Sequence, residues 1–187
     1  MQTRFAPLSE QDMTSEQKRV ADAIAGGPRG GLRGPFHALL RSPELADRVR
    51  HLGDFVRFES AFPPALRELA ILLVARFWSA DYEWNAHSKH AVTAGLDPAI
   101  PAAIATGQRP EKLSADEALV YELISELLTD RDISDATYEA AKGRFGERAI
   151  VELIATAGYY GFVSLVLNAA RTPVPEGGAR LPPLPAR

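Results

Sequence analysis

RELAILLVARFWSADYEWNAHSKH, residues 67–90, is the most informative segment of the chain for its fold. Its first half carries an uncharged apolar run over 69–75 between Glu68 and Arg76. A run of this kind, bounded by charged residues, is typical of a helix buried in a core. The pair Pro63-Pro64 lies just upstream, and proline is favoured in the first turn of a helix. We therefore expect a buried helix to begin at these prolines.

The second half of the stretch predicts another helix directly after the first. Ser79 is expected to cap its N-terminus, and Asp81 and Glu83 suit the positive end of its dipole. Gly95 marks its expected end.

The same start and stop signals recur on both sides of this pair of helices. Ser9 with Asp12, or Ser15, is expected to cap a first helix through about Ala25. Ser114 and Glu117 form a capping-box pattern. Sustained two-residue alternation, the mark of a strand, is missing from the sequence. The prediction is an all-α protein of about seven to eight helices, the remaining ones over about 42–58, 97–107, 134–143 and 147–170.

The length of the chain and its short linkers favour one domain. A chain of 187 residues is close to a single typical domain. The linker over 106–114 is short enough for the helices on both sides to share one core. We therefore expect a single domain over 1–170, followed by a proline-rich tail over 171–187 that is extended or disordered.

Composition excludes several classes of function. The net charge is −3, which argues against a nucleic-acid partner. The chain has no cysteine, so it has no thiolate metal site, cysteine nucleophile or thiol redox cycle. No export signal is visible at the start, and the uncharged run over 153–170 is better explained as a core or subunit-contact helix than as a membrane span. The expectation is a cytoplasmic protein.

Three polar residues of the deciding stretch share one helix face. Glu83, His87 and His90 are spaced four and three apart, which brings their side chains close together. A carboxylate beside an imidazole raises its pKa and orients it, as a general acid or base requires. Tyr82 and Trp84 could keep such a site dry. The alternative from spacing alone is a solvated polar face.

The same three residues leave a metal site open as a second interpretation. Glu-x3-His-x2-His offers three ligands for zinc or iron, with a fourth needed elsewhere. The two histidines, however, lack the four-residue spacing of a zinc hydrolase helix.

Several segments of the sequence resemble the carboxymuconolactone decarboxylase family, which shares its fold with the alkylhydroperoxidases of the AhpD type. The resemblance is carried by the apolar helix over 67–75, by Tyr82-Glu83-Trp84-x-x-His87 and by Ala91-x-x-x-Gly95-Leu96. Gly34-Pro35-Phe36-His37 and Ser42-Pro43 extend it upstream, so that it covers about residues 30–107. It implies an AhpD-like helical bundle.

The chain departs from the peroxidase branch of that fold at both cysteines. The branch's pattern of Glu, Cys-x-x-Cys and His falls here on Glu68, Ala80, Glu83 and His87. Peroxide reduction by a cysteine pair needs an attacking and a resolving thiol, and neither alanine nor glutamate supplies one. A peroxidase or peroxiredoxin label would therefore be unsupported for this chain.

The resemblance instead implies a decarboxylase or related acid–base lyase or isomerase without a cofactor. The expected substrate is a small unsaturated lactone carboxylic acid of the 4-carboxymuconolactone type, with His87 as proton donor and Glu68 or Glu83 orienting it. Arg76, or an arginine of the 29–41 region, would hold the substrate carboxylate. The remaining candidates for the pocket are Phe36, His37, Tyr82, Trp84 and His90.

Two further expectations accompany this one. The family implies homo-trimers or homo-hexamers, and the apolar surface of 153–170 and 69–75 favours subunit contacts. The alternative function is a catalytically inactive member of the superfamily that binds a small acid or a protein partner.

Overall fold

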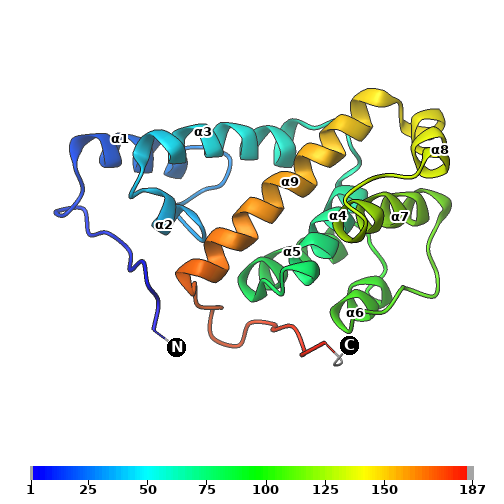
Figure 1. Ribbon diagram of the computed structural model, residues 1–187. Helices are drawn as coiled ribbons and strands as arrows, with labels where there is room; N and C mark the ends of the chain where they lie inside the picture. The colour runs from blue at the N-terminus through cyan, green and yellow to red at the C-terminus, as the bar shows by residue number, and fades with distance from the viewer. Residues whose placement is uncertain (1, 185–187) are drawn as a thin grey trace. The chain divides into compact units, whose positions relative to one another are not determined.

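A computed structural model describes residues 2–184, and the regular secondary structure in this range is entirely helical. They form nine α-helices and one π-helical turn, η1, without a β-strand in the described range (Figure 1). The all-α fold expected from the sequence is confirmed. Contacts group the chain into two compact units, residues 2–60 with 165–173 and residues 61–164 with 174–184, and each is described here by itself.

The first unit contains α1 (Ser15–Ala25), α2 (Phe36–Leu39), α3 (Pro43–Asp54), η1 (Phe55–Glu59) and the last residues of α9. Its core is built from apolar side chains with 6% exposure or less, among them Val20, Ile24, Phe36, Leu40 and Val56. An ion pair of 2.8 Å between Arg29 and Asp54 connects the loop between α1 and α2, residues 26–35, to the end of α3.

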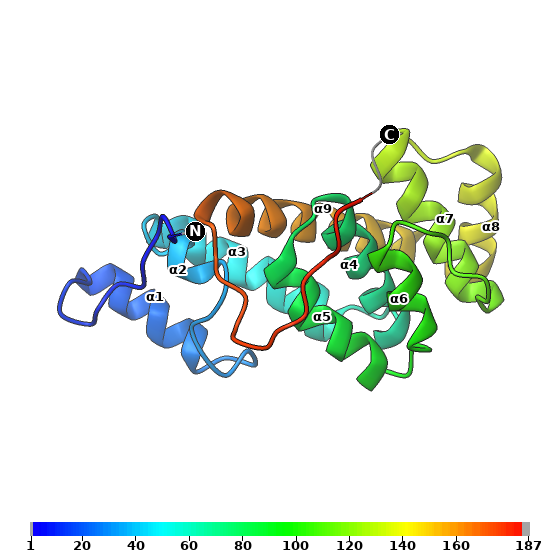
Figure 2. The same ribbon diagram turned by 90° about the horizontal axis from the view of Figure 1, so that it is seen from below.

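The second unit contains the remaining helices. They are α4 (Pro64–Phe77), α5 (Asp81–Thr93), α6 (Ala99–Ala105), α7 (Ala115–Thr129), α8 (Asp135–Phe145) and most of α9 (Glu147–Ala170). The central element is α4, which packs against α5, α6 and α7, while α8 packs on α7. The view of Figure 2 shows α5 and α6 beside α4.

The sequence explains why α4 is central. Proline stands in its first turn, and every side chain of the apolar run over 69–75 is buried. Burial on all sides removes the apolar run from water, which is the main driving force for the packing of this unit. The chain then turns through Trp78, Ser79 and Ala80 into α5, so α4 and α5 form a helical hairpin.

Some predicted helix ends differ from the observed ones. Thr14, rather than Ser9 or Ser15, caps α1 by a capping box with Gln17. Ser79 does not cap α5, because it adopts a left-handed backbone conformation with φ of 49° and Ala80 precedes the helix. The capping box of Ser114 and Glu117 is confirmed at the start of α7.

The C-terminal segment (174–184) has no helix and is held on the second unit by main-chain hydrogen bonds. The Ala179 amide donates to Asn85 Oδ1 at 2.9 Å, and the Leu181 amide donates to Asp81 Oδ1 at 3.0 Å. The carbonyl of Pro182 accepts from Arg76 at 2.9 Å. Both ribbon views show this segment running beside α5.

The longest helix, α9, is long and apolar enough to cross a membrane by length and composition alone. In its most apolar window 56% of the residues are buried inside the protein, which is how the core helix of a soluble protein passes the same test. A cytoplasmic location stays a prediction.

Candidate active site

The hairpin of α4 and α5 brings three of the predicted site residues into contact. Glu68 lies in the first half of α4, and Glu83 and His87 lie one turn apart on α5. The side chains are almost completely buried, with exposed fractions of 5% for each glutamate and 3% for His87. The solvated polar face considered for this segment is therefore wrong for Glu83 and His87.

Both nitrogens of the His87 ring face a carboxylate. Nδ1 lies 2.6 Å from Oε2 of Glu68, and Nε2 lies 2.9 Å from Oε1 of Glu83. A neutral imidazole carries one N–H and so donates to only one carboxylate, whereas an imidazolium donates to both. The geometry therefore fits a protonated His87. We call these three residues the Glu–His–Glu cluster.

The electrostatics of the cluster favour the same protonation state. Burial by itself lowers the pKa of His87, but the charges of Glu83 and Glu68 and their hydrogen bonds outweigh it. Together they raise the pKa of His87 from 6.5 to about 9. At neutral pH the buried ring is thus protonated and positively charged, which is the state that a general acid requires.

Aromatic rings close the space around the imidazole. The ring of Tyr160, on α9, meets the His87 ring edge to face, with centroids 4.9 Å apart. His90 makes a similar contact at 5.5 Å and lies at the exposed end of this group. Trp84 is buried, and Tyr82 is half-buried on the same helix. These rings and the helix packing keep bulk water from His87.

A metal site does not fit the cluster as it stands. Within residues 2–184 no group of three or more histidine, aspartate or glutamate side chains is arranged to hold a metal ion. His87 uses both ring nitrogens on carboxylates, so it would become a ligand only by giving up one of these hydrogen bonds.

Arg76 is also buried, but it takes part in a different arrangement. It lies eight positions after Glu68 on α4, a rise of about 12 Å along the helix axis. Its guanidinium donates to the carbonyls of Ala105 and Pro182 and to the Ser79 hydroxyl. The pocket that Arg76 borders is lined by neither glutamate of the cluster nor by His87. The structure therefore does not bring Arg76 into contact with the Glu–His–Glu cluster.

Phe36 and His37 lie on α2 in the first unit. Phe36 is buried, and the guanidinium of Arg29 lies over its ring, 5.2 Å from the centroid. Burial and the nearby charge of Arg41 lower the pKa of His37. Their membership of a substrate pocket stays a prediction.

Comparison with known proteins supports the family on part of the chain. Residues 43–120, which include the whole Glu–His–Glu cluster, match the family described as the carboxymuconolactone decarboxylase family. The resemblance stated from the sequence is thereby confirmed over this segment, and the sequence has no cysteine. No curated protein matches the chain.

A solved structure supports the fold over a longer range. The chain is similar to the crystal structure of an uncharacterized peroxidase-related protein from Silicibacter sp. TM1040, with a TM-score of 0.69. The alignment covers 90% of both chains at 13% sequence identity. At this identity the similarity establishes the AhpD-like fold and says nothing about activity.

The sequence did not point to Tyr160 as a neighbour of His87. It lies in the uncharged run of α9, far along the chain, where a tyrosine looks like any other core residue. The only available signal was a pair of phenol groups, Tyr159 and Tyr160, within a run that carries no charged side chain.

Proposed function

We propose that this protein is a cofactor-independent acid–base enzyme of the carboxymuconolactone decarboxylase type, with His87 as the proton donor. The substrate would be a small unsaturated lactone carboxylic acid. The observation that carries the proposal is the buried imidazole held at both nitrogens by Glu68 and Glu83. An imidazolium in a site with little water supplies both a proton and a positive charge.

The reaction would proceed in two steps. The bond between the substrate carboxylate and the ring carbon breaks, carbon dioxide leaves, and the electron pair spreads through the unsaturated lactone to its carbonyl oxygen. His87 stabilises that oxyanion by its charge and then transfers its proton to carbon. The imidazole regains a proton from solvent at the end of the turnover.

The two glutamates would have different roles. Glu68 makes the shorter contact, 2.6 Å to Nδ1, and comes from the neighbouring helix, so it orients the ring. Glu83 makes the longer contact, 2.9 Å to Nε2, and sits one turn away on the same helix. A change in the Glu83 rotamer would expose the Nε2 proton to a substrate approaching from the side of His90.

The test is an assay of the purified protein on 4-carboxymuconolactone and a panel of related lactone acids. Turnover is followed by loss of the lactone's ultraviolet absorbance and by release of carbon dioxide. His87→Ala, and the nearly isosteric His87→Gln, are expected to lower kcat by roughly a hundredfold or more. His51→Ala is the matched control, because His51 is an exposed histidine of α3.

Complete pairing and burial of His87 also favour a second candidate function. A buried imidazole with both ring nitrogens on carboxylates would then have a purely structural role and hold α4 against α5 in an inactive family member. In that case neither the parent protein nor the His87 variants would turn over any acid of the panel. Folded variants, checked by circular dichroism, with undiminished activity would also contradict the proposed role of His87.

A further inference from the structure

Tyr160 brings a third helix into contact with the Glu–His–Glu cluster. Glu68 comes from α4 and Glu83 from α5, whereas Tyr160 lies on α9, in the part of that helix that belongs to the second unit. Its exposed fraction is 2%, and its ring meets the His87 ring at a centroid distance of 4.9 Å and an interplanar angle of 78°. This contact therefore depends on the packing of α9 and not on either carboxylate.

The two carboxylates leave one motion of the imidazole weakly restrained. Each N–H of an imidazolium lies in the plane of its ring, so the hydrogen bonds to Glu68 and Glu83 hold the His87 ring within that plane. They do little against a tilt about the line through Nδ1 and Nε2, and the χ2 preference of histidine is broad. The ring of Tyr160, packed almost at a right angle, opposes that tilt. His90 makes a similar contact at 5.5 Å, but its exposed ring is less constrained.

The face of a phenol ring also stabilises a nearby cation. That face is negative, and a positive group within about 6 Å of the ring centroid is attracted to it, most strongly where water is excluded. The centroid of the His87 ring lies within this distance of Tyr160, and both side chains are buried. Because both N–H groups of His87 face carboxylates, a C–H edge of the imidazolium is the part left to meet the phenol face.

We propose that Tyr160 is a positioning residue, which keeps the His87 ring in place and charged while Glu83 moves away from Nε2. Its role in turnover rests on the proposed function of His87. When Glu83 changes its rotamer to admit the substrate, the imidazolium keeps Glu68 as its carboxylate partner. The contact with Tyr160 does not involve Glu83, so it persists through that step and holds the proton donor toward the substrate.

The first experiment measures the pKa of His87 by ¹⁵N NMR in the full chain and needs no substrate. Tyr160→Phe keeps an aromatic ring and should titrate like the parent. Tyr160→Leu removes the ring and should lower the pKa of His87 by about one unit. Tyr160→Met, which fills more of the space without a ring, should give the same fall. The fall should be as large in a Glu83→Gln background, because the ring contact does not pass through Glu83.

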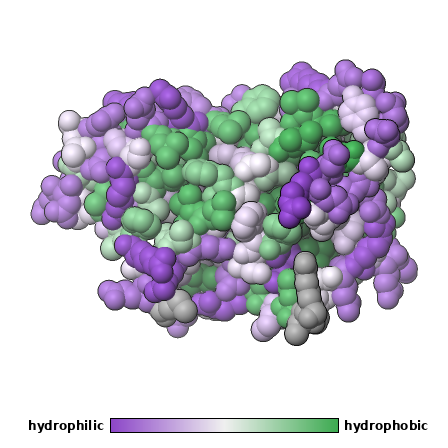
Figure 3. Space-filling model, viewed as in Figure 1, coloured by the Kyte–Doolittle hydropathy of each residue, from purple (hydrophilic) through white to green (hydrophobic). Residues whose placement is uncertain are grey.

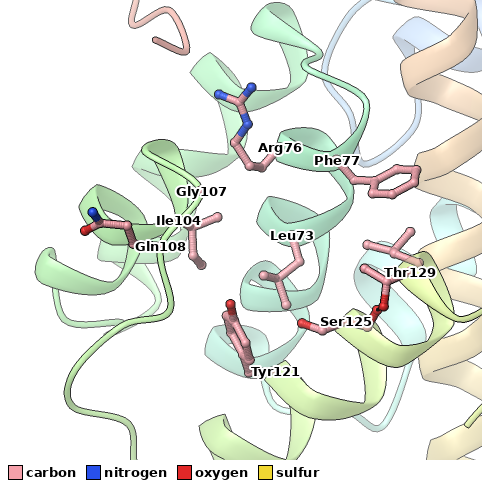
Figure 4. Close-up of a pocket in the computed structure, with 10 residues that line it drawn as sticks. Leu73, Arg76, Phe77, Ile104, Gly107, Gln108, Tyr121, Ser125 and Thr129 are labelled. Carbon is pink, nitrogen blue, oxygen red and sulfur yellow. Dashed lines mark hydrogen bonds between the residues drawn. The ribbon is translucent and has the colours of Figure 1, made fainter. Parts of the chain in front are cut away.

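Ile104→Ala is the matched control for a general loosening of the second unit. Ile104 is 2% exposed and lines the pocket between α4, α6 and α7 that Figure 4 shows. The lining of this pocket includes neither Tyr160 nor a member of the Glu–His–Glu cluster. Truncation at Ile104 also removes buried apolar volume, so it should destabilise the fold but leave the pKa of His87 at the parent value.

The second experiment measures turnover on the panel of lactone acids. Tyr160→Leu should lower kcat by about tenfold with little change in KM, because a poorly oriented donor affects the proton transfer more than substrate binding. Tyr160→Phe should keep the parent kcat. A purely structural role of Tyr160 predicts instead that Ile104→Ala and Tyr160→Leu lose activity in parallel.

Two results would overturn the proposal for Tyr160. One is a pKa of His87 that stays at the parent value in both Tyr160→Leu and Tyr160→Met. The other is an equal fall of this pKa in Ile104→Ala. A parent protein that turns over no acid of the panel would instead refute the proposed function, and with it the role of Tyr160 in turnover, whatever the NMR titration shows.

Discussion

His87 combines two properties that rarely occur together, almost complete burial and a raised pKa. Burial alone would lower the pKa and favour the neutral imidazole. Glu68 and Glu83, however, contact the ring from both sides and raise the pKa of His87 to about 9. The folded protein therefore binds this proton more tightly than the unfolded chain does, where the pKa is near 6.5.

A pH dependence of stability follows from this shift. The contribution of His87 to the free energy of unfolding is complete below pH 6.5 and is lost as the pH rises through about 9. The shift corresponds to about 3 kcal/mol. Denaturant unfolding between pH 6.5 and 9.5 should reveal the decline.

Glu83→Gln is the variant that tests the cause of this decline. It keeps an oxygen near Nε2 but removes one negative charge, so the pKa of His87 should fall and the decline should begin at lower pH. His51→Ala, an exposed control, should decline like the parent. An unchanged pH profile in Glu83→Gln would contradict the role assigned to that carboxylate.

Among the contacts of His87, the sequence predicted those that lie within one helix and those that the family resemblance implies. The four-residue spacing of Glu83 and His87 predicts their contact because a helix brings such positions together. Glu68 was found through the resemblance, since it lies on another helix. Tyr160 was missed because tertiary packing, which no local pattern encodes, brings α9 to the ring.

At the scale of elements, the C-terminal segment behaves as a fixed part of the second unit. Asn85 and Asp81, one turn apart on α5, accept from the amides of Ala179 and Leu181. Gly178 lies so close to the helix that an added Cβ would be 2.7 Å from Oδ1 of Asn85. Only glycine fits this approach, so the sequence of the tail is matched to the surface it covers.

Asn85→Ala should release this segment. The Ala179 amide loses its acceptor, so its hydrogen exchange should accelerate and trypsin should cleave after Arg180 faster. Asn85→Asp keeps an acceptor oxygen and should protect the segment as the parent does. Equal cleavage of Asn85→Ala and the parent would show that this hydrogen bond does not hold the segment.

Helix existence was easier to predict than helix ends. Buried apolar runs such as 69–75 specify α4 regardless of context, and the Ser114 capping box is a local interaction. Ser79 was misassigned because the tight turn from α4 places it in a left-handed conformation, from which it does not cap α5. The sequence of the proline-rich tail did not indicate that its backbone amides donate hydrogen bonds to side chains of α5.

At the scale of the molecule, α9 carries an exposed apolar face on the second unit. Val151 is 64% exposed and Ile154 is 40% exposed, and Gly158 follows them one turn further on. Figure 3 shows apolar side chains gathered over the beginning of this helix. Exposed apolar faces often form protein contacts, so we expect this one to lie at a subunit contact of the homo-oligomer that the family resemblance implies.

Ile154→Lys should therefore lower the mass of the particle in solution. Light scattering at micromolar concentration is expected to show an oligomer, a trimer or hexamer, for the parent and a smaller species for the variant. Leu45→Lys, at a similarly exposed position of α3, is the control and should keep the parent mass. A monomeric parent protein would refute this prediction.

The most direct test of the Glu–His–Glu cluster is a measurement of the pKa of His87 by ¹⁵N NMR of its ring nitrogens. The expected result is an imidazolium at pH 7 that titrates near 9, with both ring N–H protons observable in hydrogen bonds. A His87 ring that is neutral at pH 7, with a pKa at or below 6.5, would contradict it.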